Sequence, residues 1–247
     1  MRAFLGMLLL SCCAFALAEQ PNRDYEEQFL QEHHIAITNG AVTGALRDHD
    51  AGVRQAASHV LSNRWPSQSV SPIQEAMLRE NDALVRVYLA GDLAELGNDA
   101  GRHTLKTECH NHENRGSTRI VAAESLIHLH DDSCDDAVLE VLRADSDPQD
   151  TLAKVYALNL VPSFIHHSDR REYQLVMDLT LRDLHDPDGE VRITTATTLG
   201  SLGDASAIPA LQVAAENEPD ATVRNAMLTE LEKLMHVSAS VLDIVWS

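Results

Sequence analysis

Residues 188–204 read DGEVRITTATTLGSLGD, and this stretch carries the signals of one capped helix. Val191 and Leu199 fall on the same face of a helix with 3.6 residues per turn, so they predict a buried side. Asp188 lies at the start, where a carboxylate accepts backbone N–H groups of the first turn. Gly203 follows the last apolar residue and suits the left-handed conformation that ends many helices.

The same arrangement recurs along the chain. A basic residue marks each recurrence, 32 to 38 residues after the one before: Arg54, Arg86, Arg119, Lys154, Arg192 and Arg224. An aspartate lies four residues before five of them: Asp50, Asp82, Asp150, Asp188 and Asp220. A period in this range is typical of arrays of helix pairs. We therefore predict about six pairs, each with a helix A followed by an antiparallel helix B that carries the basic residue.

The middle of the chain departs from this pattern. Arg115 occupies the position of the capping aspartate, Lys154 replaces the arginine, and Pro162 is expected to interrupt a helix B. We call the six recurring basic residues the basic column, and we expect them to form structural ion pairs with the capping aspartates of the same or a neighbouring repeat. The alternative is that the column binds an anionic ligand.

Residues 188–204 resemble the short HEAT repeat of phycobilin-lyase-type HEAT proteins, and residues 78–97 and 220–234 resemble it more loosely. The resemblance covers roughly residues 41–234. It implies an all-α fold, an α-solenoid of HEAT-type helix pairs in a right-handed superhelix. Proteins of this kind usually bind other proteins, and some are enzymes.

The ends of the chain are predicted to close this array. Residues 19–40 form an N-terminal capping region with a helix over 24–34, and residues 41–236 form the repeats. Residues 237–247 form an apolar closing segment. Such caps are needed because a terminal repeat otherwise exposes one face of its core.

The N-terminus has the features of an export signal. A basic residue precedes an apolar run over residues 3–17, which is too short to span a bilayer, and residues 16–18 read Ala-Leu-Ala. We predict a signal peptide over residues 1–18, cleaved after Ala18, and a bacterial protein of the periplasm or the medium without an integral membrane segment. A lipoprotein with a lipidated Cys12 is the alternative.

The composition restricts the class of partner. The chain has 38 Asp and Glu against 19 Lys and Arg, a formal net charge of −19 at pH 7. A surface of this charge repels nucleic acid and anionic lipid headgroups, so we expect neither as a ligand. It is compatible with a protein partner that offers a basic or apolar segment.

A candidate binding surface follows from the repeat. Helical geometry places a second set of positions opposite the predicted core face of each helix B, and five apolar residues occupy them in the middle repeats: Val87, Ile120, Ile127, Val155 and Ile193. Solvent-facing helix positions are normally polar. One explanation is a groove along the B helices that binds a partner segment. The other is burial between adjacent repeats, where a stacked helix has less free surface.

Two clusters of potential metal ligands lie near predicted turns, at residues 109–113 (CHNHE) and 128–136 (HLHDDSCDD). Thiolate, imidazole and carboxylate groups are the ligands of zinc and related ions. Neighbouring A helices are expected to run parallel, which separates Cys109 from Cys134 by roughly 12 Å along the axis. That separation is too long for a disulfide. We therefore expect two separate, solvated loops. A disulfide between Cys109 and Cys134 is the alternative, and it requires the loop around Cys109 to fold back.

No phosphate-binding loop, nucleophile elbow or zinc-protease motif is present in the sequence. The functional prediction is a non-catalytic scaffold or adaptor that needs no cofactor and binds a partner segment along the B helices. A metal-binding or metal-dependent protein that uses the His-, Asp- and Cys-rich turns is the alternative.

Overall fold

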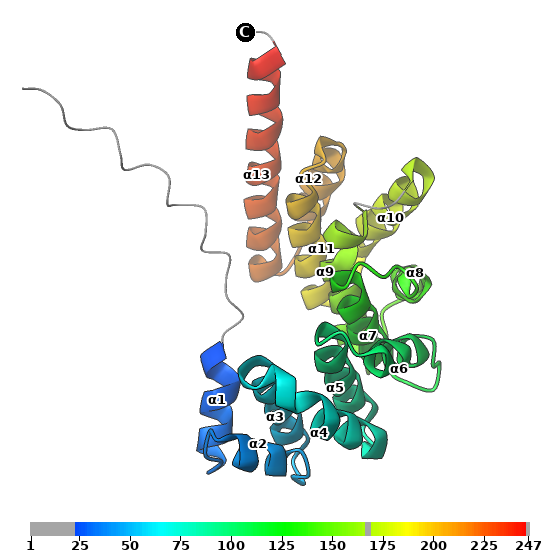
Figure 1. The fold of residues 1–247 in the computed structure, drawn as a ribbon. Coiled ribbons are helices and arrows are strands. Elements are labelled where there is room, and N and C mark those ends of the chain that lie inside the picture. Colours follow the sequence, from blue (N-terminus) through cyan, green and yellow to red (C-terminus); the bar gives the residue numbers. More distant parts are fainter. Residues whose placement is uncertain (1–22, 166–168, 246–247) are drawn as a thin grey trace, which may run out of the picture.

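The computed structural model describes residues 23–165 and 169–245, and within these ranges the chain is helical without any strand. The predicted all-α solenoid of about six helix pairs is confirmed (Figure 1). None of these helices combines the length and the apolar character needed to cross a bilayer. The predicted signal peptide, 1–18, and the alternative lipidation site at Cys12 lie outside the described residues.

The pairs follow an arc in which the predicted A helices lie on the outer side and the B helices on the inner side (Figure 1). The outer helices are α2 (Asn39–Ala45), α4 (Pro66–Arg79), α6 (Asp99–Cys109), α8 (Asp135–Arg143), α10 (Arg170–Arg182) and α12 (Ile208–Asn217). The inner helices are α3 (Ala51–Arg64), α5 (Ala83–Glu95), α7 (Gly116–His128), α9 (Thr151–Ile165), α11 (Gly189–Leu202) and α13 (Ala221–Val245). Short 3-10 helices, η1 (Asp183–His185) and η2 (Ala205–Ala207), precede α11 and α12.

The two ends differ from each other. The leading helix is α1 (Arg23–Glu32), which packs on α3 and extends the inner layer by one helix. The closing segment predicted over 237–247 is not a separate element, because α13 continues through it to Val245.

Pro162 does not interrupt its helix. The inner helix α9 runs through it to Ile165, although proline cannot donate a hydrogen bond to the carbonyl four residues earlier. That carbonyl belongs to Leu158, and it accepts a hydrogen bond of 3.1 Å from the hydroxyl of Thr198 on α11. A side chain of the next repeat therefore satisfies the backbone group that the proline leaves without its usual partner.

Aspartate side chains begin most of the inner helices as the sequence predicts. Asp50, Asp82, Asp188 and Asp220 accept backbone N–H groups of their own first turns at 2.7–3.3 Å. Asp150 is different, because its carboxylate accepts the N–H of Ser117, 2.9 Å away at the start of α7 in the preceding repeat. The helix α7 has Arg115 at its own N-cap, without a side-chain cap, so the neighbouring repeat supplies the missing acceptor.

Four arginines of the basic column form ion pairs that we call arginine rungs, each joining an inner helix to the outer helix that follows it, whereas Arg224 donates to the backbone carbonyl of Glu218. Arg54 donates to both carboxylate oxygens of Glu80 at 2.7 and 2.9 Å, and Arg192 binds Glu218 at the same distances. Arg86 and Arg119 bind Glu108 and Glu140. The predicted ion pairs are present, but the predicted partners are wrong, because the aspartates are already occupied by backbone N–H groups. Each guanidinium also holds down the pKa of its glutamate in the pairs with Glu80, Glu140 and Glu218.

Lys154 takes the place of the arginine in the fourth repeat. Its side chain is only 2% exposed, and its Nζ donates to the carbonyls of Leu142 and Ala144 at the end of α8. Asp183 Oδ2 lies 3.3 Å from the same nitrogen. Burial lowers the pKa of Lys154, and the charge of Asp183 opposes that shift.

The buried apolar residues form two clusters along the arc. The larger extends from Leu30 to Val191 and the smaller from Met177 to Leu234. Both α10 and α11 contribute to each cluster, so the core continues from pair to pair as expected for a solenoid.

Candidate partner-binding site

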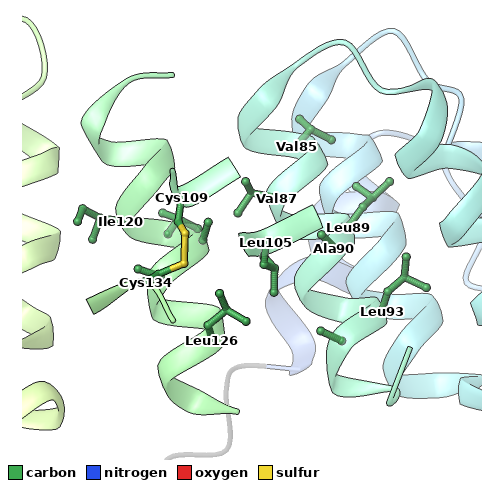
Figure 2. Packing of buried hydrophobic residues seen from close by; sticks show 14 of the residues in the cluster. Val85, Val87, Leu89, Ala90, Leu93, Leu105, Cys109, Ile120, Leu126 and Cys134 are labelled. Atoms are coloured by element: carbon green, nitrogen blue, oxygen red, sulfur yellow. A yellow bond between two sulfur atoms is a disulfide. The ribbon is translucent and has the colours of Figure 1, made fainter. Parts of the chain in front are cut away.

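The apolar strip predicted on the B helices is mostly buried. Val87 and Ile120 are completely inaccessible to solvent (Figure 2), and Val155 is 8% exposed. Of the two explanations for these three residues, burial between adjacent repeats is therefore confirmed, and the open groove is wrong for them. Ile127 and Ile193 are half-buried and pack against the core. For these two side chains, contact with a partner stays a prediction.

The reason lies in how the inner helices are packed. An inner helix such as α5 contacts α4 and α6 on its outer side and also α3 and α7, its counterparts in the two neighbouring repeats. Apolar side chains are therefore needed on three sides. The open face is therefore narrower than in an isolated amphipathic helix.

Polar residues mark the open face. A cavity of about 470 Å³ lies there between α1, α3, α5 and α7, and we call it the inner pocket. It is lined by Tyr25, Glu26, Phe29, Gly52, Gln55, Ala56, His59, Tyr88, Gly91, Asp92, Glu95 and Ser125. The volume is within the range of natural ligand sites. The sequence analysis missed this pocket because it followed apolar residues, whereas the few polar residues of the inner helices lie on the free side.

Asp92 is the most buried charged group of the inner pocket, with 7% of its surface exposed. Its carboxylate accepts a hydrogen bond from the hydroxyl of Ser58 and lies 3.2 Å from Nδ1 of His59. The hydroxyl of Ser62 is 3.4 Å away. All three partners come from α3, so this network also ties α3 to α5 beneath the pocket floor.

The electrostatics of the pocket follow from this network. The hydrogen bond to Asp92 raises the pKa of His59, although burial opposes the shift. Partial burial and, to a lesser degree, the charge of Asp92 raise the pKa of Glu95. Desolvation likewise raises the pKa of Tyr88. The pocket is thus a region in which negative charges lie close together beside apolar rings.

The network contains two members of a serine-protease type of triad but not its reactive hydrogen bond. In such a triad the serine donates to the histidine, which is held by the aspartate. Here Ser58 donates to Asp92 itself, and Ser125 on the opposite wall donates to the carbonyl of Val121 at 3.0 Å. Neither hydroxyl is therefore hydrogen-bonded to the base that would activate it.

The two clusters rich in Cys and His are brought together, contrary to the sequence-based expectation. Cys109 and Cys134 form a disulfide with a Cα–Cα distance of 6.2 Å (Figure 2). The expectation failed because α8 does not run alongside α6. Cys109 is the last residue of α6, and Cys134 is the N-cap of α8, which packs on α7, α9 and α10 (Figure 1). The two sulfurs therefore meet where one helix ends and the other begins.

The connection before α8 is folded onto the end of α6. Lys106 pairs with Asp131 at 2.8 Å, and His110 Nε2 lies 3.1 Å from Asp136 Oδ1. Within the described ranges, Cys109, His110 and Cys134 are the one group of side chains close enough to share a metal ion. The disulfide consumes both thiols, and a cysteine binds a metal as its thiolate. With the disulfide formed, Cys109 and Cys134 are therefore not available as ligands, and the alternative of a metal-binding protein stays a prediction that depends on the His and Asp side chains.

Comparison with known proteins agrees with the repeat architecture. The family described as HEAT repeats matches residues 177–246, which include the smaller core cluster and the rung between Arg192 and Glu218. The match supports a HEAT-repeat protein. A search of curated proteins finds no match for the chain.

Proposed function

We propose that this protein is a non-catalytic interaction scaffold of the bacterial periplasm that holds a segment of a protein partner against its inner helices. The observation that supports this most directly is the inner pocket, whose walls come from α1, α3, α5 and α7. HEAT repeats commonly serve as protein-interaction scaffolds, and the match to this family supports the same role.

The proposal assigns particular positions to the partner. The inner pocket takes one part of the bound segment, and the half-buried Ile127 and Ile193 contact the remainder further along the arc. An extended or helical segment suits such a surface, because a solenoid presents a long inner face rather than one deep cavity. The periplasmic location rests on the export signal read in residues 1–18.

Site-specific photo-crosslinking in intact cells tests the scaffold. A photoreactive amino acid is placed at Gln55 or Glu124 on the inner side, and at Glu75 or Asp178 on the outer helices as matched controls. We expect one protein to crosslink from the inner positions and not from the outer ones. Crosslinks from the outer positions alone would contradict the proposal.

Two further measurements complete the test. The purified crosslinked partner is titrated with the wild type and with Tyr88→Ala, and we expect the variant to bind at least about tenfold more weakly, since aromatic side chains dominate many interfaces. Cell fractionation and N-terminal mass determination test the location. A mature chain that begins at Glu19 in the periplasmic fraction agrees with it, and an intact Met1 in the cytoplasm contradicts it.

A further inference from the structure

The inner pocket has an unbalanced charge that indicates the chemistry of its occupant. Three of the described residues that line it are acidic, Glu26, Asp92 and Glu95, and none is Lys or Arg. Asp92 is occupied by Ser58 and His59. Glu26 on α1 and Glu95 on α5 accept no hydrogen bond from any other described residue. Two carboxylates from different helices therefore remain available to a cation.

Aromatic rings share the pocket with these carboxylates. Tyr25 and Phe29 come from α1, and Tyr88 comes from α5. Tyr25 is 59% exposed although it is a large apolar ring, so its face is available to a ligand. A cation placed over an aromatic ring is attracted by its negative face, and more strongly where water is partly excluded.

We propose that the inner pocket binds the guanidinium group of an arginine side chain in the partner segment; this inference rests on the proposed scaffold function. A guanidinium is planar, so it stacks on a tyrosine or phenylalanine ring while its edge donates two hydrogen bonds to a carboxylate. It is also more weakly hydrated than an ammonium group, which favours a site that is partly apolar. Glu26 and Glu95 bind its N–H groups, and Tyr88 and Phe29 contact its face.

His59 does not oppose this arrangement. Its Nδ1 lies 3.2 Å from Asp92 at the pocket floor, and the side chain of Asp92 is only 9% exposed. The imidazole is therefore held by Asp92, and the two glutamates at the walls carry the remaining acidic charge of the pocket. The arginine is accordingly held at the mouth, between α1 and α5.

The test uses the full-length mature protein and three short peptides that are identical except at one residue. Each peptide places arginine, lysine or citrulline between glycines and serines, and citrulline keeps the shape of arginine without its charge. Binding is followed by NMR titration. We expect the arginine peptide to bind at least tenfold more tightly than the citrulline peptide, and severalfold more tightly than the lysine peptide.

Matched variants separate the pocket from the overall negative charge. Glu26→Gln/Glu95→Gln removes two charges in the pocket, and Asp99→Asn/Glu113→Gln removes two charges from exposed positions elsewhere. We expect the pocket variant to bind the arginine peptide about tenfold more weakly and the surface variant to bind it as the wild type does. Circular dichroism checks that both variants are folded.

Several results would overturn the inference. Equal binding of the arginine and citrulline peptides, no binding of the arginine peptide at millimolar concentration, or equal losses in both variants would each exclude a guanidinium site. If the crosslinked partner is held equally by the pocket variant, the arginine site is wrong and the scaffold stands. If the peptide binds but no partner crosslinks, the scaffold is wrong instead.

Discussion

In the first and fifth repeats, an arginine on the inner helix donates hydrogen bonds to both carboxylate oxygens of the glutamate 26 residues later. These pairs are Arg54 with Glu80 and Arg192 with Glu218. In the fourth repeat, Lys154 at the same position is buried and donates mainly to the carbonyls that end α8. The arginines also donate to backbone carbonyls that follow the preceding outer helix, Arg54 to Asp48 and Arg192 to Asp186. The contact with these carbonyls is therefore common to arginine and lysine, and the two arginines add a glutamate of the next outer helix.

Two hydrogen bonds between repeats compensate for departures from the repeat pattern in the middle of the chain. Asp150 caps α7 of the preceding repeat, and Thr198 donates to the carbonyl that Pro162 leaves free on α9. The Cys109–Cys134 disulfide joins two outer helices across the same region. Departures from the repeat pattern are therefore compensated by contacts between repeats.

The largest expected effect is at Lys154. Lys154→Ala removes a buried cation and leaves Asp183, which is 3% exposed, with Arg182 as its remaining ion-pair partner among the described residues. We expect the free energy of unfolding in urea to fall by about 4 kcal/mol. Arg192→Ala is the matched end-repeat variant, with an expected loss of about 2 kcal/mol, because the Arg192 side chain is 15% exposed and that of Lys154 is 2% exposed. Equal losses would remove the distinction between a fully buried cation and one that water reaches in part.

The second largest expected effect on stability concerns the disulfide between Cys109 and Cys134. Cys109→Ala/Cys134→Ala opens a loop with a sequence separation of 25 residues, so we expect a loss of about 3 kcal/mol from the greater freedom of the unfolded chain. Wild-type protein unfolded in the presence of a reductant should lose a similar amount. A double variant as stable as the oxidised protein would show that the non-covalent contacts alone hold α6 and α8 together.

The smallest expected effect concerns the exchanged cap. Asp150→Ala should cost about 1 kcal/mol, the usual value of a lost N-cap. The more specific test is which backbone amide is affected. Hydrogen exchange should accelerate at the amide of Ser117 on α7, because that amide loses its acceptor. In the control, Asp188→Ala, the accelerated amide is Glu190, on the variant's own helix. Acceleration at the start of α9 instead would contradict the exchange of caps.

Much of the architecture was predictable because it depends on local sequence. The capping aspartates, the apolar period and the repeat length all act within one helix or one pair, so Asp50, Asp188 and the helix α11 were identified correctly. The errors concern contacts between repeats. The groove explanation for Val87 and Ile120, and the expectation that Cys109 and Cys134 lie in separate loops, both assumed identical stacking throughout.

The sequence by itself determined the helices, their pairing order and the number of repeats, since hydrophobic period and capping are read within a few turns of chain. The tertiary structure decided which faces remain open, which cysteines meet and where charges gather. These features depend on the angle and offset between successive pairs, and that geometry is set by packing of side chains far apart in the sequence. The inner pocket belongs to this second group, because Glu26, Asp92 and Ser125 share it only after three repeats have stacked.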